Sequence, residues 1–240
     1  MRDFFKTFFK GWNAFEYAFL VASFALPLTI GLVFKSGALE IASTITYLVV
    51  GLLYAKGKIL GYFLNFAGLA LYGAVAIRQH LYSEIIIAGC LTLPATIYGV
   101  WQWARNKFSN AQKGEVVKVR HLSLLELSLL VVSQVVMGVG YYFMLRAFHS
   151  ELVLWATFSI ATSFFVSYLL ARRYVYALAA SLINDVVVIG MWATFALTIG
   201  RGTIVMIVMT GMYLVIDVYG IISWHRLKKA QDKAAVPMVQ

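Results

Sequence analysis

Long apolar stretches dominate this chain of 240 residues and constrain its fold more than any other feature. A helix needs about 20 mostly apolar residues to cross a bilayer, and eight stretches approach that length. The runs are continuous rather than alternating, which argues against membrane-spanning strands. We therefore predict an all-α integral membrane protein with eight transmembrane helices. The stretches are Ala14–Phe34, Ala38–Ala55, Ile59–Ile77, Ser83–Trp103, Leu122–Ala147, Leu152–Ala171, Tyr174–Ile199 and Thr203–Trp224.

The composition excludes most soluble functions. The chain is 62% hydrophobic and only 12% charged, whereas a soluble domain carries about 25% charged residues. Its single cysteine, Cys90, excludes an internal disulfide and a thiolate metal cluster. The four histidines have no Glu, Asp or Cys at metal-ligand spacing, and no phosphate loop, nucleophile elbow or catalytic triad pattern is visible. We therefore expect no enzyme, cofactor or metal site, and the lack of a soluble output domain disfavours a sensor.

The basic residues indicate the orientation in the membrane. With eight spans, both termini and every second loop share one side, and that side carries sixteen of the 20 Lys and Arg residues. Because cationic loops stay in the cytoplasm, we predict a multi-pass protein of the bacterial inner membrane with both termini cytoplasmic. The lipid bilayer, and not nucleic acid, is then the partner that explains the net charge of +10. The other side carries only Lys35, Arg78, Arg146 and Arg201.

An internal repeat relates the two halves of the chain. The segment Tyr98–Trp103 reads Tyr-Gly-x-x-x-Trp, and Tyr219–Trp224 reads the same 121 residues later. Asn65 likewise precedes Asn184 and Asp185 by 119 and 120 residues. The second to fourth spans and the sixth to eighth spans thus form two copies of a three-helix unit, and the fifth span restores their orientation. We predict a parallel 3+1+3 repeat with one extra N-terminal helix, a plan that places transporter substrates at the repeat interface near the midplane.

The repeat sets the expected domain organisation. Outside the spans we expect loops and a polar tail after Arg226, with no soluble domain. Pro94 falls inside the fourth span and is expected to kink it. The parts are an N-terminal tail and extra helix (1–36), the first three-helix repeat (37–104), a cytoplasmic loop and linker helix (105–150), the second three-helix repeat (151–226) and a cytoplasmic tail (227–240).

Two acidic residues lie at membrane depth. Asp185 is near the middle of the seventh span and Asp217 lies within the eighth. A carboxylate at the bilayer centre costs roughly 3 kcal/mol or more unless it faces a cavity or a partner, and no basic residue lies at matching depth. Binding of a cationic substrate is the favoured reading; a proton or sodium coupling site and a structural hydrogen-bonded acid are the alternatives. The glutamates are interpreted as solvated helix starts, where the helix dipole favours anions: Glu16, Glu40, Glu84, Glu126 and Glu151.

Polar and aromatic side chains recur at helical spacing around these acids. Carboxylates can supply counter-charge, amides and hydroxyls can bind hydroxyl or carboxamide groups, and aromatic rings can stack on a flat cation or gate its path. Trp103 and Trp224, near span ends, fit interfacial anchors equally well. The candidate substrate-binding residues are Asp185, Asn184, Ser181, Trp192, Asn65, Tyr72, Thr96, Tyr213, Asp217 and Tyr219.

Four motifs resemble those of one known family. Lys56–Phe63 and Leu71–Gly73 look like its first-half signature, Ile97–Trp103 looks like its helix end, and Arg172–Val175 looks like the segment that opens its second-half substrate helix. Over roughly residues 45–226 the chain therefore resembles the PnuC family of vitamin transporters. The resemblance implies a fold related to the SWEET sugar transporters and facilitated diffusion of an unphosphorylated vitamin precursor, which a cytoplasmic kinase then traps. It implies no catalysis, and it allows a homo-oligomer such as a trimer.

The chain departs from the family pattern in its pocket. The family's Trp-x-x-Trp-x-x-x-Asn corresponds here to Leu178, Ser181 and Asp185, and the family Asn before Tyr-Gly corresponds to Thr96 and Asp217. The change from amides to carboxylates favours a cation. We therefore expect nicotinamide riboside, whose pyridinium ring is cationic, as the substrate. The alternatives are a related carrier for thiamine or a nucleoside, and a proton-coupled carrier that uses Asp185.

Overall fold

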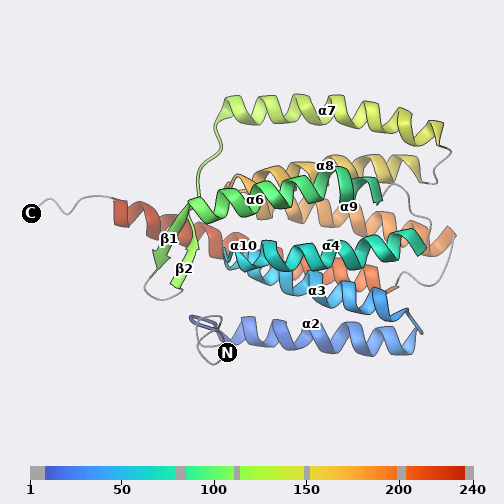
Figure 1. Ribbon diagram of the computed structural model, residues 1–240, viewed down its shortest axis with the longest axis horizontal. Helices are drawn as coiled ribbons and strands as arrows, with labels where there is room; N and C mark the ends of the chain where they lie inside the picture. The colour runs from blue at the N-terminus through green and yellow to red at the C-terminus, as the bar shows by residue number, and fades with distance from the viewer. Residues whose placement is uncertain (1–8, 79–84, 111–113, 149–151, 199–203, 236–240) are drawn as a thin grey trace, which may run out of the picture.

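The computed structural model describes residues 9–78, 85–110, 114–148, 152–198 and 204–235, which form a bundle of long helices with a small β-hairpin at one end (Figure 1). The all-α prediction is confirmed for the membrane part of the chain. The elements are α2 (Ala14–Val33), α3 (Ala38–Ala55), α4 (Leu60–Arg78), η1 (Ile87–Thr92), α6 (Leu93–Arg105), β1 (Lys107–Asn110), β2 (Gly114–Val117), α7 (Leu124–Ala147), α8 (Val153–Ala171), α9 (Ala177–Thr198) and α10 (Ile204–Ala235).

Seven helices in the described part of the chain are long and apolar enough to cross a membrane, one fewer than the eight predicted. The fourth predicted span is helical from residue 85 to Arg105, but it is divided into the π-helical η1 and the α-helical α6. The division falls at Pro94, in the first turn of α6. Proline has no N–H to bond the preceding turn, and a π-helical turn accommodates that loss. The structure thus has a widened turn just before Pro94.

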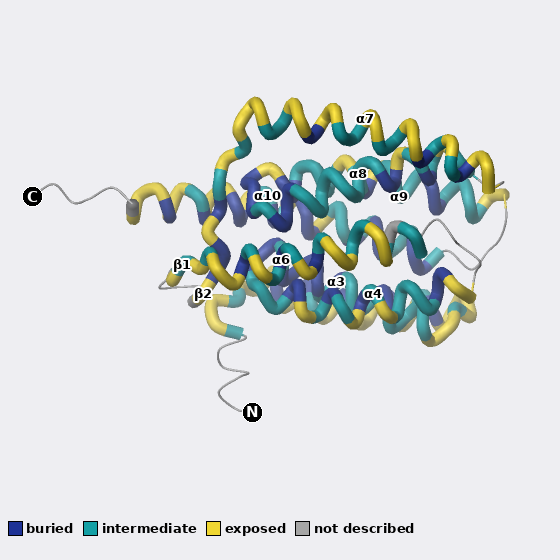
Figure 2. The backbone as a smooth tube through the Cα atoms, turned by 45° about the horizontal axis from the view of Figure 1, so that its top comes forward, coloured by how far each residue is buried: buried dark blue, intermediate teal, exposed yellow. Residues whose placement is uncertain are grey.

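Six helices close into a ring. α3 packs against α4, α4 against α6, α6 against α8, α8 against α9, α9 against α10, and α10 against α3. We call α3, α4 and α6 the first half of the ring, and α8, α9 and α10 the second half. α2 packs outside the ring against α3 and α10, and α7 packs outside it against α8. Figure 2 shows the outer side of α7 exposed along its length, as expected of a helix that faces lipid.

The two ends of the bundle differ. The turn after α3, the β-hairpin and the turn after α8 meet at one end, which we call the hairpin end (Figure 1). There the Val117 N–H donates to the Gly57 carbonyl (2.9 Å), and the Arg120 N–H donates to the Arg173 carbonyl (2.9 Å). The sequence assigns four basic residues to the other side of the membrane. Three of them, Lys35, Arg78 and Arg146, lie at the opposite end of the bundle, and Arg201 lies outside the described residues.

Two segments predicted as irregular are ordered. β1 and β2 form an antiparallel hairpin where a cytoplasmic loop was expected. α10 does not end at Trp224 but continues to Ala235, so the predicted polar tail is largely helical. The side chain of Gln231 explains why. It accepts a hydrogen bond from the Val119 N–H and donates one to the Val117 carbonyl, both at 2.9 Å, and so fastens the helix to the hairpin.

The start of α2 corrects one expectation. Asn13 and Glu16 form a capping box, in which the Glu16 N–H donates to Asn13 Oδ1 (3.0 Å) and the Asn13 N–H donates to Glu16 Oε2 (2.8 Å). Glu16 is not solvated, however, because it is fully buried in an ion pair with Lys56. Glu40 and Glu126 lie in the first turns of α3 and α7 as expected, but Glu126 is paired with Arg172 rather than left to solvent. Glu84 and Glu151 lie outside the described residues.

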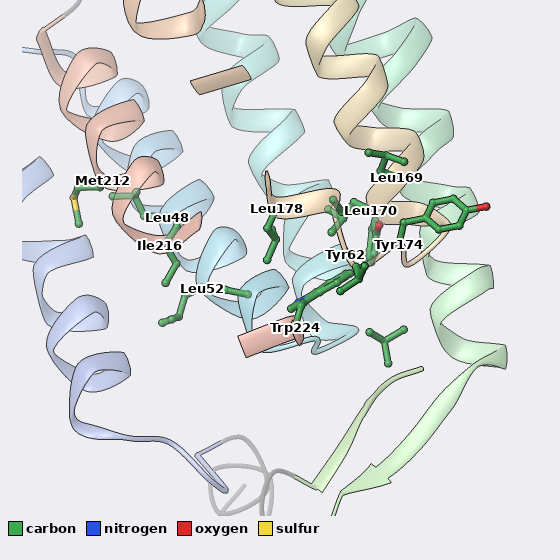
Figure 3. Close-up of a cluster of buried hydrophobic side chains, with 14 of the residues drawn as sticks. Leu48, Leu52, Tyr62, Leu169, Leu170, Tyr174, Leu178, Met212, Ile216 and Trp224 are labelled. Carbon is green, nitrogen blue, oxygen red and sulfur yellow. The ribbon is translucent and has the colours of Figure 1, made fainter. Parts of the chain in front are cut away.

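A continuous apolar core runs through the bundle, and Figure 3 shows the part of it nearest the hairpin end. Leu48 and Leu52 of α3 face Ile216 of α10, all of them buried, and Trp224 lies below them. Trp103 and Trp224 are 1% and 0% exposed. The alternative that these tryptophans anchor the protein at a lipid interface is therefore wrong.

Candidate functional site

A cavity of about 200 Å³ lies inside the ring, and all six ring helices contribute to its wall. Helical spacing brings the contributing side chains inward, since residues three or four apart share one face. Seven of the ten candidate residues from the sequence line this cavity: Asn65, Thr96, Ser181, Asn184, Asp185, Tyr213 and Asp217.

One wall of the cavity is acidic. Asp185 of α9 and Asp217 of α10 are 4% and 3% exposed. Their carboxyl groups lie within hydrogen-bonding reach of each other, and Ser181 lies within reach of Asp217. We call Ser181, Asp185 and Asp217 the acid wall. No Lys, Arg or His occurs among the cavity-lining residues that the structure describes, so a cationic ligand is the natural counter-charge for this wall.

The wall built by α4 and α6 is polar but uncharged. The Asn65 Nδ2 donates to the Thr96 hydroxyl (2.8 Å), which in turn donates to the Thr92 carbonyl (2.7 Å). The ring of Tyr62, one turn before Asn65, rests on Gly99, where any Cβ would collide with it. We call Tyr62, Asn65 and Thr96 the neutral wall.

The two walls occupy related positions in the repeat. Asn65 and Asp185 are 120 residues apart, and Thr96 and Asp217 are 121 apart. Within the first half of the ring Asn65 joins α4 to Thr96 of α6, and within the second half Asp185 of α9 lies against Asp217 of α10. The same positions therefore carry neutral groups in one half and carboxyl groups in the other.

Aromatic rings pack on the side of the cavity nearest the hairpin end. Tyr54 and Tyr62 line the cavity and lie 4.8 Å apart by ring centroids. Tyr62 lies 4.9 Å from Trp103, which lies 5.9 Å from Trp224. Figure 3 shows Tyr62 beside Trp224 at the lower edge of the core. The rings form a continuous layer between the cavity and the hairpin.

Three candidate residues lie elsewhere. Trp192 is buried against Phe195 (5.8 Å between ring centroids) and does not line the cavity. Tyr72 packs edge-on against Tyr47 (5.9 Å) and is also absent from the lining.

Tyr219 points out of the ring toward α2. Its hydroxyl donates to Glu16 Oε1 (2.7 Å) and accepts from Asn13 Nδ2 (2.9 Å). Residues two apart on a helix point roughly 200° apart, so Tyr219 and Asp217 cannot face the same cavity. The prediction that Tyr219 belongs to the cavity is wrong for this reason.

Asn184 lines the cavity but already has partners. Its Oδ1 accepts hydrogen bonds from the hydroxyls of Thr162 (2.6 Å) and Ser163 (3.1 Å), both on α8. The amide therefore joins α8 to α9. Its remaining capacity for a ligand is its NH₂ group, which can still donate.

Sequence reasoning missed several tyrosines of the lining. Tyr47 and Tyr54 of α3 flank Gly51 on one face, and all three line the cavity. Their spacing of four and three residues is the signal that could have revealed them. The hydroxyl of Tyr213 donates to the Tyr47 carbonyl (2.7 Å) and holds α10 against α3.

The turn after α8 forms a separate polar cluster at the hairpin end. Hydrogen bonds from Arg172 to the Tyr98 hydroxyl (3.3 Å) and to Glu126 (2.5 Å) raise the pKa of Arg172. Burial lowers the pKa of Arg173. Burial and a hydrogen bond to Glu126 raise the pKa of Tyr174. This cluster ties the start of α7 to the second half of the ring and lies outside the cavity lining.

Comparisons with known proteins agree on one family. A family profile described as "Nicotinamide mononucleotide transporter" matches residues 37–226. The chain is similar to a protein of Neisseria mucosa named "Nicotinamide riboside transporter PnuC", with 24% identity over 225 residues that cover 93% of this chain and 86% of that protein. Its fold is similar to a crystal structure of the vitamin B3 transporter PnuC, with a TM-score of 0.85 and 24% identity, covering 95% of this chain and 97% of the other.

Proposed function

Because this chain belongs to the nicotinamide mononucleotide transporter family, we propose that it takes up nicotinamide riboside, a vitamin B3 precursor, by facilitated diffusion. The family is one of transporters and not of enzymes. The observation that carries the choice of substrate is the acid wall. Asp185 and Asp217 face a cavity that has no basic lining residue in the described structure, and the pyridinium ring of nicotinamide riboside supplies the missing positive charge.

The same charge balance favours the riboside over the mononucleotide. A 5′-phosphate would enter a cavity with two carboxyl groups and no Lys, Arg or His in its described lining. Like charges repel strongly where water is scarce, because the effective dielectric constant is low. An unphosphorylated substrate avoids that repulsion. A cytoplasmic kinase would then phosphorylate it and prevent its return.

The tyrosines of the cavity fit a flat ring. Tyr47, Tyr54 and Tyr213 line it together with the two aspartates. Aromatic faces attract cations and stack on planar rings. The family tryptophans are absent at Leu178 and Ser181, and these tyrosines supply aromatic surface in their place.

The closed ring supports a parallel 3+1+3 arrangement of the SWEET type. In this proposal the first and second halves of the ring are the two repeats, α7 is the linker helix and α2 is the extra helix. η1 and α6 together form the fourth of eight spans. The basic hairpin end faces the cytoplasm of the bacterial inner membrane with both termini, and the exposed flank of α7 is available for lipid or for another copy in a homo-oligomer.

Equilibrium binding to the purified protein in detergent tests the substrate. Nicotinamide riboside is compared with its reduced form, which keeps the sugar and carboxamide but has a neutral ring. We expect tighter binding of the cation by about 10-fold or more, and loss of that preference in Asp185→Asn and Asp217→Asn. Asp232→Asn, which removes an exposed acid from the end of α10, is the matched control and should keep the preference. Equal binding of the two forms by the unmodified protein would reject the counter-charge role.

The same assay compares other vitamins. Thiamine carries a cationic thiazolium ring, whereas thymidine and riboflavin are neutral. Preference for thiamine would keep the role of the two aspartates and change the substrate. Preference for a neutral nucleoside would keep the fold and contradict the role of the aspartates.

The acid pair also favours a second candidate, a proton-coupled carrier. Two carboxyl groups within hydrogen-bonding reach can share a proton. Uptake into proteoliposomes with an imposed pH gradient distinguishes the candidates. A coupled carrier accumulates the substrate against its gradient when the pH difference is imposed, and Asp185→Asn abolishes this accumulation. Facilitated diffusion equalises the concentrations on both sides at any pH difference.

A further inference from the structure

Apart from the contact that the two aspartate carboxyl groups make with each other, three buried polar atoms of the cavity have no hydrogen-bond partner among the described residues. They are the Oδ2 atoms of Asp185 and Asp217 and the hydroxyl of Tyr62. A buried polar atom without a partner costs free energy, so such atoms in a binding cavity mark where a ligand can add stability. Two of these atoms belong to the acid wall and the third belongs to the neutral wall.

Tyr62 is held in place by its surroundings. It is 3% exposed, and its ring packs against Tyr54, Trp103 and the backbone at Gly99. The absence of a side chain at Gly99 is what lets the ring come so close. A hydroxyl on a ring fixed in this way is a rigid hydrogen-bonding group, and little entropy is lost when a ligand binds it.

The other groups of the neutral wall are partly engaged. Asn65 donates to Thr96, and Thr96 donates to the Thr92 carbonyl. The hydroxyl of Tyr62 has no partner among the described residues, so both its donor and its acceptor capacity are available to a ligand. A sugar hydroxyl donates and accepts at one atom and so matches this group, and 1-methylnicotinamide, which keeps the carboxamide but has no sugar, separates the two kinds of contact.

The geometry points to a single orientation for the substrate, with its cationic ring against the acid wall and its sugar against the neutral wall, where Tyr62 hydrogen-bonds a sugar hydroxyl. This inference rests on the proposed function. The walls come from different halves of the ring, α9 and α10 for the acids and α4 and α6 for the neutral groups. Tyr62 is then a specificity-determining residue that recognises the sugar through a hydrogen bond, while Asp185 and Asp217 recognise the positive charge of the ring.

Two ligands separate these roles. Nicotinamide riboside carries both the ring and the sugar, and 1-methylnicotinamide carries the same cationic ring with a methyl group in place of the sugar. Affinities are measured by competition in detergent for the unmodified protein, Tyr62→Phe and Asp217→Asn. Tyr141→Phe is the control, because it removes a buried tyrosine hydroxyl on α7 that does not line the cavity.

We expect Tyr62→Phe to weaken the affinity for nicotinamide riboside by about 10-fold and to change the affinity for 1-methylnicotinamide by less than about 2-fold. Asp217→Asn should weaken the affinity for both ligands by about 10-fold, and Tyr141→Phe should leave both affinities unchanged. Retained binding of 1-methylnicotinamide by Tyr62→Phe also shows that the variant is folded.

Three outcomes would overturn the orientation. Tyr62→Phe could lose affinity for both ligands equally, or for neither of them. Alternatively, 1-methylnicotinamide at about 10 mM, where even a weak fragment should bind, could fail to compete for the unmodified protein. Failure of the unmodified protein to bind nicotinamide riboside would instead reject the proposed function. The two failures are thus distinguishable in one data set.

Discussion

Trp103 and Trp224, 121 residues apart in the sequence, lie with their rings 5.9 Å apart at the hairpin end of the ring. Each donates its indole N–H to a backbone carbonyl of the opposite half. Trp103 donates to Leu170 at the end of α8 (3.0 Å), and Trp224 donates to Tyr54 at the end of α3 (2.9 Å). The repeated Tyr-Gly-x-x-x-Trp motif therefore joins the two halves, because each copy satisfies a helix end in the other.

Replacement of these tryptophans should destabilise the contact between the two halves of the ring. Trp103→Phe and Trp224→Phe each remove one indole donor from a carbonyl that keeps a backbone partner, the Arg173 N–H at Leu170 and the Gly57 N–H at Tyr54. The loss of one hydrogen bond should lower the free energy of unfolding by about 1 kcal/mol. Because the two rings are neighbours, the double variant should lose an amount of unfolding free energy that differs from the sum of the two single losses. Thermal unfolding in detergent measures both effects. Trp101→Phe, at a ring 47% exposed on the same helix, is the control, and a loss there as large as at Trp103 would contradict the argument.

The glycines of the ring should respond differently to alanine. A Cβ at Gly99 would collide with the Tyr62 ring, and one at Gly220 would collide with Leu178, whereas Gly73 has open space around it. We expect Gly99→Ala and Gly220→Ala to lower the melting temperature, and Gly99→Ala also to weaken riboside binding by displacing Tyr62. Gly73→Ala should match or exceed the stability of the unmodified protein, since alanine favours the helix by about 1 kcal/mol. A riboside affinity unchanged in Gly99→Ala would contradict the assigned position of Tyr62.

The buried ion pair of Glu16 and Lys56 should be sensitive to removal of one partner. Glu16→Gln leaves the Lys56 ammonium buried without its counter-ion, which typically costs about 3–5 kcal/mol. The double variant with Lys56→Met should recover part of this loss, because no uncompensated charge remains. Melting temperatures of the single and double variants measure the difference. Equal stability of Glu16→Gln and the unmodified protein would show that α2 does not depend on the pair.

Tyr174 should make the protein sensitive to alkali. Its pKa is raised in the folded state by burial and by a hydrogen bond to Glu126. The stabilisation from a raised pKa is complete below the unfolded value of about 10 and is lost as pH rises through the folded value. The melting temperature should therefore fall above about pH 10, and Tyr174→Phe should make this fall shallower. Tyr176→Phe, at a neighbouring tyrosine that is 50% exposed, is the control and should leave the pH profile unchanged.

Much of the architecture could be predicted because apolar length and repeated motifs are local properties of the chain. Seven of the eight predicted spans coincide with long apolar helices, and the fourth is helical across the break at Pro94. The π-helical turn, the hairpin and the extension of α10 escaped prediction. Each depends on contacts made after folding, such as those of Gln231 with the hairpin backbone.

The candidate site could be predicted in part. Asp185 and Asp217 stood out because a carboxyl group at membrane depth needs a partner or a cavity, and both line the cavity. Tyr219 was misplaced because sequence proximity to Asp217 says nothing about the opposite direction of its side chain. Tyr62 was overlooked because nothing in its local sequence shows that its hydroxyl has no hydrogen-bond partner among the described residues.

By itself, the sequence determined which long apolar segments are helices, which residues repeat, and that carboxyl groups lie at membrane depth. Only the tertiary structure decided which face of each helix points into the ring. With it came the pairing of Asn65 with Thr96, the burial of Glu16 against Lys56 and the position of the Tyr62 hydroxyl, which has no partner in the described part of the chain. The physical reason is that helix formation in a membrane follows from the length and polarity of a segment. Burial and hydrogen bonding, by contrast, depend on side chains that other helices bring close, and in the case of Glu16 and Tyr219 these lie 203 residues apart.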